Sequence, residues 1–224
     1  DLVIVGRLLG VEAFASVGAT APLFFLITFI IVGLTNGFAV ITGQRYGAKN
    51  YDGVKNSVVI STVLSFGVSL LFTIFCTLLM HPVLHMLNVP ENIYHNAYWY
   101  TEIIVLGLVA TTFYNLLASL IRALGDSKTP LYFLIIASIV NIFLALFFIK
   151  YLHLGVAGSA VAVILSQAIS VILCLIYVKK KFTILHLKKS DWKIKFDKNF
   201  ANSALEHLKV GIPMSLQFSI IGIG

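Results

Sequence analysis

Long stretches without charged residues constrain this chain more than any other feature. Five of them, 19 to 32 residues long, lie at 13–44, 56–80, 103–121, 131–149 and 154–178. Because a helix needs about 20 apolar residues to cross the hydrocarbon core of a bilayer, each stretch is long enough to span a membrane. Hydrophobic residues make up 59% of the chain and charged residues 11%, against about 45–50% and about 25% in soluble domains. The sequence therefore predicts a membrane protein.

The expected spans are helices with defined limits. The first stretch is too long for one perpendicular span, so we expect a loop up to about Ala21, with Pro22 in the first turn of a helix over 21–44. Residues 1–10 and 210–224 are shorter apolar pieces. We expect five whole helices between an incomplete first and an incomplete seventh helix. The runs are continuous rather than alternating, which excludes a barrel and predicts an all-α polytopic bundle.

The basic residues indicate an orientation and a division of the chain. Fourteen of the sixteen follow the second, fourth and sixth spans, and nine of these are lysines between Lys179 and Lys209. The positive-inside rule places these connections, and the amino terminus, in the cytoplasm. The histidine-containing segment 81–95 is expected as an outer loop. We divide the chain into a six-helix lobe (1–181), a basic cytoplasmic linker (182–209) that is either a solvated loop or a segment on the anionic inner leaflet, and the start of a seventh helix (210–224).

Enzyme and metal motifs are absent from the sequence. It contains no glycine-rich phosphate loop, no His-Glu-x-x-His helix and no nucleophile elbow. His81 and His85 are spaced four apart, but Pro82 and the lack of a glutamate argue against a metal site. Cys76 and Cys174 each lie within an apolar run and are expected as buried thiols. The clustering of the lysines in one segment argues against nucleic-acid binding. We expect no enzyme, metal or cofactor.

Polar residues inside the spans are candidates for function, because polar groups in lipid are costly and normally face an interior cavity. Glu102 is expected to reach the interface near the outer end of its helix. The amides are more often interhelical hydrogen-bond partners than ligands. Gly33 and Gly37, four residues apart, are spaced for close helix packing. The candidates are Asp1, Asn36, Glu102, Asn115, Asn141 and Gln167.

Four groups of residues in order resemble the multidrug and toxic compound extrusion (MATE) family. They are Asp1-x-x-x-Val5-Gly6 with Gly10-Val-Glu-Ala-Phe-Ala, Gly33-Leu-Thr-Asn-Gly37 leading to Gln44-Arg-Tyr-Gly-Ala-Lys-Asn50, Arg122-Ala-Leu-Gly-Asp-Ser-Lys-Thr-Pro130, and Asn141-Ile with Gly155-Val-Ala-Gly-Ser-Ala-Val-Ala. Gly211-Ile-Pro213 resembles the entry into that family's seventh helix. The resemblance covers essentially the whole chain. It implies a twelve-helix antiporter of two six-helix lobes, of which this chain is the first, with alternating access between the lobes.

The resemblance also implies an ion site in this lobe. The first-helix aspartate matches Asp1 and the amide of the fifth helix matches Asn141, whereas the family's partner carboxylate is Ala145 here and its threonine is Val163. Because sodium favours several hard oxygen ligands whereas a proton needs one titratable group, we expect proton coupling at Asp1, oriented by Asn141. The alternative is an ion site in the second lobe, with this lobe lining the substrate path through Asn36, Asn115 and Gln167.

The expected function is export of organic, cationic and lipophilic compounds in exchange for protons or sodium. The expected partners are small organic cations, the coupling ion, the bilayer and the second lobe, and the expected location is the cell membrane. A flippase for a lipid-linked saccharide would favour a basic cavity, and the spans contain almost no internal lysine or arginine. A membrane-embedded enzyme would need a nucleophile or a metal cluster at one depth, and the sequence contains none. A non-transporting scaffold is compatible with the composition.

Overall fold

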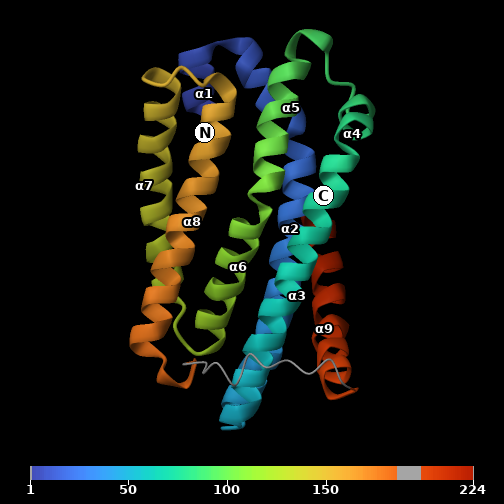
Figure 1. Cartoon of the computed structure of the whole chain (residues 1–224), viewed down its shortest axis with the longest axis vertical. Helices are drawn as coiled ribbons and strands as arrows, with labels where there is room; N and C mark the ends of the chain where they lie inside the picture. The colour runs from blue at the N-terminus through green and yellow to red at the C-terminus, as the bar shows by residue number, and fades with distance from the viewer. Residues whose placement is uncertain (1, 186–197, 224) are drawn as a thin grey trace.

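The chain folds into a bundle of helices that confirms the predicted fold class (Figure 1). The computed structural model describes residues 2–185 and 198–223, and within these ranges it contains helices and no strand. The α-helices are α1 (Leu2–Leu9), α2 (Val11–Gly47), α3 (Tyr51–Leu78), α4 (Met80–Met86), α5 (Glu91–Leu106), α6 (Leu108–Ala123), α7 (Lys128–Lys150), α8 (Gly155–Lys181) and α9 (Lys198–Ile223). A 3₁₀ turn, η1, covers Thr183–Leu185.

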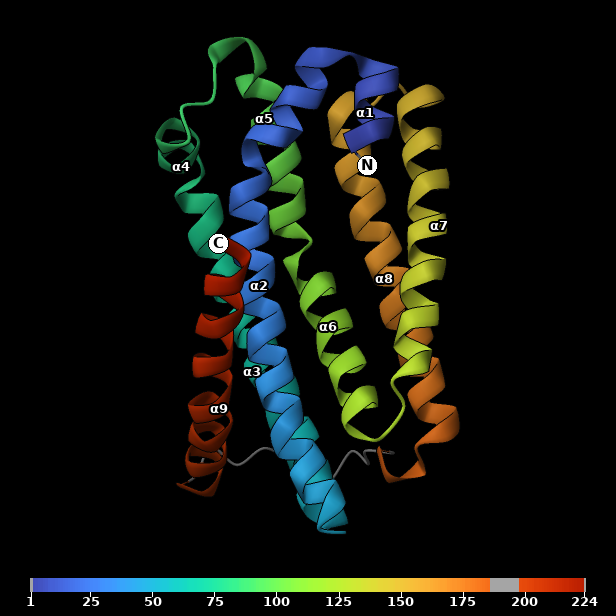
Figure 2. The ribbon, with the colours of Figure 1, turned by 180° about the vertical axis from the view of Figure 1, so that it is seen from behind.

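The helices form two groups joined by a central pair. Figures 1 and 2 show α7 and α8 packed side by side, α2, α3 and α9 packed on the other side, and α5 and α6 between the groups. The connections α2–α3 and α6–α7, the end of α8 and the start of α9 lie at one end of the bundle. We call this the basic end, because it carries the charges of Arg45, Lys55, Arg122, Lys128 and Lys181.

The number of whole spans agrees with the prediction. Four helices, α2, α3, α7 and α8, are long and apolar enough to cross a membrane, and there are five spans if the bent pair α5–α6 is counted as one. The side chains of α7 that face outward are large and apolar, among them Leu131, Ile135 and Phe143. This lining suits contact with lipid tails.

The predicted loop before Ala21 is wrong. Residues 11–47 form one continuous helix, α2, and Pro22 lies inside it. The reason is tertiary packing: Ala13 and Val17 are buried in a cluster with Val5 of α1, Ile149 of α7 and Val156 of α8. A helix of 37 residues is about 55 Å long, so α2 exceeds the hydrocarbon thickness of about 30 Å and extends beyond it. Length alone did not indicate where the helix begins.

The predicted single helix over 103–121 is also wrong. α5 ends at Leu106, α6 begins at Leu108, and the two helices are bent by 47° at Gly107. A Cβ atom on Gly107 would lie 2.3 Å from Cγ1 of Ile164 on α8. A glycine therefore lets the Ile164 side chain insert at the bend, which gives the break a packing cause.

Two further boundaries differ from the expectation. The segment 81–95, expected as a loop, contains α4 and the start of α5, and the His81 Nδ1 atom lies 2.7 Å from the Tyr94 hydroxyl. The helix expected from Val210 begins at Lys198. Residues 186–197, which hold much of the predicted basic linker, lie outside the described residues, so the membrane-surface interpretation of the linker stays a prediction.

Two close backbone approaches join α2 to α9. A Cβ atom on Gly33 would lie 2.3 Å from the Cα atom of Ser215, and one on Gly37 would lie 2.4 Å from the Cα atom of Gly211. The expected packing role of this glycine pair is therefore confirmed: the absence of side chains allows two helix backbones to touch. We call this contact the glycine seam.

We expect Gly37→Ala to lower the stability of the protein by about 1–3 kcal/mol, because the new methyl group would meet the backbone of α9 rather than a movable side chain. The thermal unfolding midpoint of the purified full-length protein in detergent measures this. The control is Gly18→Ala, also in α2, where a Cβ atom meets nothing within 4 Å. That change should be neutral or stabilising by up to about 1 kcal/mol. Equal effects of the two changes would contradict the seam.

Candidate functional site

Asn141 and Gln167 line one cavity between α7 and α8. Its volume is about 340 Å³, and its other polar lining residues are Ser138 and Ser166. The Gln167 side-chain oxygen Oε1 is buried and has no hydrogen-bond partner among the described residues. The Ser166 hydroxyl donates to the Val163 carbonyl at 2.8 Å, so its proton is already used. A donor group that reached this buried oxygen, such as an ammonium group or a water molecule, would satisfy it.

Among the described residues, the lining of the α7–α8 cavity contains amides, hydroxyls and apolar groups, and no acidic or basic side chain. Val163 lies in the lining, and Ala145 is fully buried one helical turn beyond Asn141. A hydroxyl or carboxylate at these two positions would add oxygen ligands. The residues present do not supply them.

Asp1 lies outside the described residues, so its distance from Asn141 is not defined. The helix that it precedes, α1, packs through Val5 against Ile149 of α7 and Val156 of α8. Leu2 packs against the same cluster. The start of α1 is thereby attached to the two helices that form the cavity.

Asn36 belongs to a different group of residues. Its Oδ1 atom accepts hydrogen bonds from the Ser119 hydroxyl at 2.8 Å and from Arg122 Nη2 at 3.2 Å, and Arg122 Nη2 also lies 2.9 Å from the Ser119 oxygen. These residues line a cavity of about 370 Å³ between α2, α6 and α9, where Met214 and Phe218 complete the wall. One amide thus holds a guanidinium group at the edge of a cavity. We call these three residues the Asn36 cluster.

The structure does not bring all the predicted site residues together. Asn141 and Gln167 share the α7–α8 cavity, whereas Asn36 lines the α2–α6–α9 cavity. The Nδ2 atom of Asn115 donates to the Thr111 carbonyl of its own helix at 2.8 Å. That amide is therefore held along α6 rather than by a neighbouring helix.

Glu102 corrects another expectation. Instead of reaching the interface, the residue is 8% exposed, and its Oε2 atom has no hydrogen-bond partner among the described residues. The neighbouring turn of α5 is tied to α3 by a hydrogen bond from the Thr73 hydroxyl to the Val105 carbonyl at 3.1 Å. The cause is the packing of α5 between α3 and α8, which encloses this side of the helix.

Sequence reasoning missed the polar contacts at the basic end. There Arg122 was used as a topology charge and as part of a family motif, although its spacing of three residues from Ser119 on one helix face was a usable signal for a contact. Asp126, in the α6–α7 loop, accepts hydrogen bonds from the Tyr177 hydroxyl, the Thr129 hydroxyl and Lys181. The Tyr177 bond, with the Thr129 and Lys181 bonds, holds the pKa of Asp126 well below its usual range. An ionised Asp126 therefore ties this loop to the end of α8.

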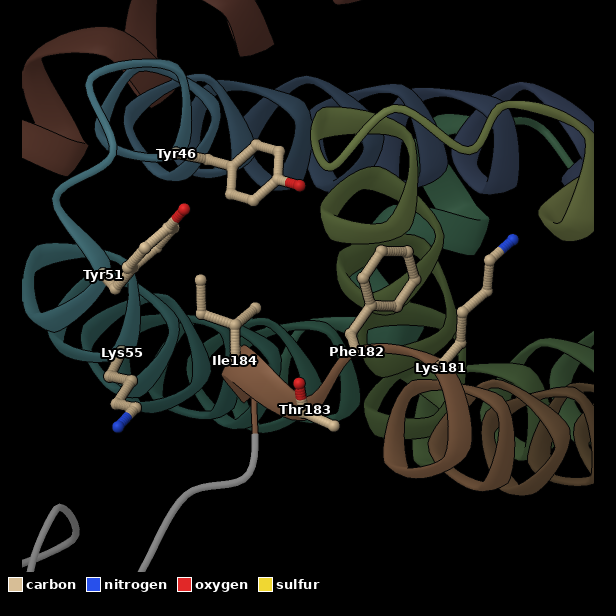
Figure 3. A pocket seen from close by; sticks show the side chains of 7 residues that line it. All are labelled: Tyr46, Tyr51, Lys55, Lys181, Phe182, Thr183 and Ile184. Atoms are coloured by element: carbon tan, nitrogen blue, oxygen red, sulfur yellow. The ribbon is translucent and has the colours of Figure 1, made fainter.

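A third cavity lies at the basic end and holds none of the predicted site residues. Its volume is about 450 Å³. Figure 3 shows the Tyr46, Tyr51 and Phe182 rings around the opening and the amines of Lys55 and Lys181 directed away from its centre. Lys181 is engaged with Asp126 at 3.1 Å. The cavity is therefore lined by rings and aliphatic stems rather than by free charges.

Comparison with known proteins places these features in a family. The MatE family model matches residues 1–147. Two curated relatives from Bacillus subtilis (strain 168) are similar over nearly the whole chain: the probable multidrug resistance protein YoeA, 30% identical over 98% of this chain and 48% of its own length, and the probable multidrug resistance protein YpnP, 33% identical over 99% and 48%. The chain thus spans about half the length of the curated relatives it matches.

Solved structures agree. An inward-facing multidrug resistance MATE family transporter of the MOP superfamily matches with a TM-score of 0.87 and 25% identity, over 98% of this chain and 49% of that chain. An outward-facing structure described in the same terms matches with a TM-score of 0.85 and 26% identity, over 97% and 47%. The fold of this chain therefore resembles about half of such a transporter.

We expect Asn36→Ala to destabilise the protein by about 1–3 kcal/mol, because Ser119 and Arg122 would lose their shared acceptor. Thermal unfolding of the full-length protein in detergent measures the loss. The matched control is Asn115→Ala, which removes one bond along α6 and leaves the Thr111 carbonyl its helical partner. That change should cost about 0.5 kcal/mol. A loss for Asn36→Ala no larger than that of the control would show that the cluster does not tie α2 to α6.

Proposed function

The chain belongs to the MatE family, and from this premise we propose that it forms the first lobe of a secondary transporter that exports organic cations in exchange for protons. The lobe would alternate with a second lobe of similar size, to which α9 belongs. The membrane would be the cell membrane, with the basic end in the cytoplasm, as the positive-inside rule favours. No catalytic step is part of this proposal.

The α7–α8 cavity is the observation that carries the proposal. It combines apolar walls with two amides, and one amide oxygen is buried with no partner among the residues that the structure describes. A lipophilic cation fits this chemistry because its apolar part replaces lipid and its donor group satisfies the Gln167 acceptor. A site for a lipid-linked pyrophosphate would need several basic side chains to bind the phosphate charges. In the part of the chain that the structure describes, the linings of the α7–α8 and α2–α6–α9 cavities contain one basic side chain, Arg122, which Asn36 and Ser119 already hold.

Proton coupling is favoured over sodium coupling by the same lining. Sodium would need several oxygen ligands in a fixed arrangement, and Ala145 and Val163 contribute none. A proton needs one carboxylate whose environment changes between the two states of the transporter. We assign this role to Asp1 and an orienting role to Asn141.

We expect Asp1→Asn in the full-length protein to abolish efflux of a cationic dye driven by an imposed pH gradient, because an amide does not exchange protons in this range. Proteoliposomes with imposed pH or sodium gradients measure the flux. The control is Glu12→Gln, a nearby acid that is exposed at the start of α2. The control should retain efflux. Efflux that follows sodium and survives Asp1→Asn would contradict proton coupling at this residue.

We expect Gln167→Ala to weaken binding of a cationic dye about twofold to tenfold, the value of one hydrogen bond to the ligand. Fluorescence titration of the purified full-length protein measures the dissociation constant. The matched control is Ser138→Ala in the same cavity, since the Ser138 hydroxyl already donates to the Leu134 carbonyl at 2.9 Å. Unchanged affinity for Gln167→Ala would remove this cavity from the binding path.

A further inference from the structure

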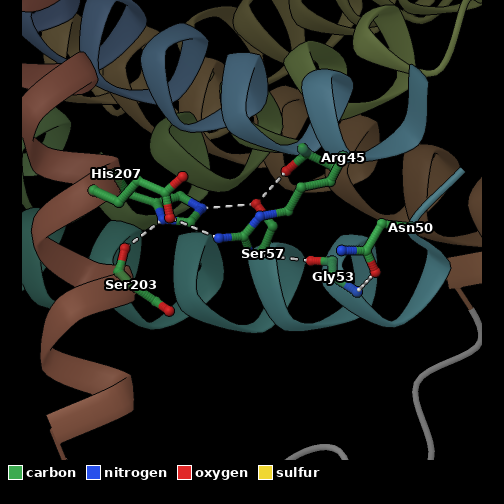
Figure 4. A network of polar contacts seen from close by, with 8 residues as sticks. Arg45, Asn50, Gly53, Ser57, Ser203 and His207 are labelled. Atoms are coloured by element: carbon green, nitrogen blue, oxygen red, sulfur yellow. Dashed lines mark hydrogen bonds and ion pairs between the residues drawn. The ribbon is translucent and has the colours of Figure 1, made fainter. Parts of the chain in front are cut away.

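The polar start of α9 is tied to α2 and α3 at the basic end (Figure 4). Arg45, near the end of α2, joins all three helices. Its Nη2 atom lies 2.7 Å from the Glu206 carboxylate of α9, and its Nη1 atom donates to the Gly53 carbonyl of α3 at 3.1 Å. One side chain therefore links the cytoplasmic ends of two helices of the first lobe to the helix that enters the second.

His207 on α9 is the centre of the same contact. It is fully buried, and both of its ring nitrogens are engaged. Nδ1 lies 2.7 Å from the Ser203 carbonyl, and Nε2 lies 2.7 Å from the Ser57 hydroxyl of α3. A carbonyl only accepts, so Nδ1 carries the proton of the neutral ring and Nε2 accepts from Ser57. This assigns one tautomer of a neutral histidine.

The hydrogen bond continues from His207 into α2. The Ser57 oxygen lies 2.8 Å from the Thr42 hydroxyl. Since the single Ser57 proton points to His207, the Thr42 hydroxyl is the donor to Ser57. The chain Thr42–Ser57–His207–Ser203 is thus fully paired when the imidazole is neutral. Each hydroxyl in it donates toward His207: Thr42 to Ser57, and Ser57 to His207.

Protonation of His207 would disturb this chain. A proton on Nε2 would donate to the Ser57 oxygen, so Ser57 would have to turn its own proton to Thr42, and Thr42 would have to find another acceptor. The new charge would also be buried, which is unfavourable without a dedicated counter-ion. If the start of α9 separated from α2 and α3, the imidazole would be hydrated. Its protonation would then neither disturb the hydroxyl chain nor bury a charge.

The charged groups around His207 compensate a buried positive charge on its ring only in part. From α2 the nearest is Arg45, and from α9 it is Glu206, which Arg45 already engages. The charged residues at the start of α3 lie elsewhere: Asp52 is exposed, and Lys55 lines the cavity of Figure 3. Burial lowers the pKa of His207; the Arg45 charge lowers it further, while the Ser203 bond and the Glu206 charge oppose the shift.

The glycine seam lies further along the same two helices. Gly37 packs on Gly211, one turn along α9 from His207, and Gly33 packs on Ser215 one turn beyond. Backbones in contact without side chains between them act as a pivot, because the helices can rotate there without opening a gap. Separation at the basic end would break the polar contacts described and the edge-on contact between the Phe38 and His207 rings.

We propose that His207 is a cytoplasmic proton-binding site, and that its neutral form latches α9 onto α2 and α3 while its protonated form releases the latch. The occupant of this site is a proton from the cytoplasm, and it differs from the coupling proton assigned to Asp1. The proposal rests on the proposed function only in requiring two lobes that move relative to one another.

The direction of the pH effect follows from the environments of the two forms. The imidazole binds a proton less readily when docked than when exposed, so docking is favoured above the pKa of an exposed histidine, about 6.5, and is lost as pH falls through that value. The ratio of undocked to docked molecules should rise by up to about tenfold between pH 7.5 and 5.5.

Spin labels placed across the latch test this. Ala48 at the end of α2 and Ala201 near the start of α9 are exposed, so Ala48→Cys and Ala201→Cys permit labelling of the full-length protein in nanodiscs, without substrate or ion gradient. Protein without these two changes gives the background from Cys76 and Cys174. Double electron–electron resonance distances should show a longer population that grows as pH falls. Distances that do not change with pH would overturn the proposal.

Variants assign the effect to one residue. His207→Gln should remove the pH dependence, since glutamine hydrogen-bonds but does not titrate here; His207→Asn serves the same purpose if the first variant does not accumulate. The matched control is His95→Gln on α5, away from the basic end, which should keep the wild-type response. A pH response that survives both His207 variants would overturn the proposal.

The two proposals fail separately. If dye efflux follows sodium and not protons while the distances still depend on pH through His207, the latch stands and the coupling assignment fails. If Asp1→Asn abolishes proton-driven efflux and the distances are independent of pH, coupling stands and the latch is rejected.

Discussion

The absence of water in the bilayer core is the constraint on which this structure depends, because a polar group there has only protein to bond with. Many hydroxyl groups in the spans find their hydrogen-bond partner on their own helix. Ser16, for example, donates to the Ala13 carbonyl of its own turn. Where the partner lies on another helix, the bond also fixes the bundle, as between Ser119 and Asn36. The remaining cases, in which a buried acceptor such as Gln167 Oε1 has no described partner, mark where a ligand would be stabilised.

α2 carries most of these cross-connections, because it contacts α1, α3, α5, α6 and α9. Its outer part closes the cluster around Val5, its middle contributes Asn36 and the glycine seam, and its basic end holds Thr42 and Arg45. A helix with three such zones connects the α1 region to the proposed latch. This gives a physical route by which events at the start of the chain and at the basic end influence one another.

Specific residues show how far sequence patterns reach. Uncharged runs located the five whole spans because lipid favours apolar helices whatever their neighbours are. The same runs did not reveal the start of α2 at Val11, the bend at Gly107 or the helix over 80–86, since each depends on a packing partner far away in sequence, such as Ile164 at the bend. The amides were found as candidates by their cost in lipid. Their division between two cavities depends on helix rotation, which single runs do not encode.

The sequence by itself determined that the chain is a helical membrane bundle, which end is basic, and which family motifs it carries, because these follow from composition and local order. Only the tertiary structure decided that Asn141 and Gln167 line one cavity, that Asn36 holds Arg122, that Glu102 is enclosed, and that His207 contacts Ser57. The physical reason is that a side chain's partners are set by the rotation and crossing of whole helices. Those are fixed by close packing between residues distant in the chain, as at the glycine seam.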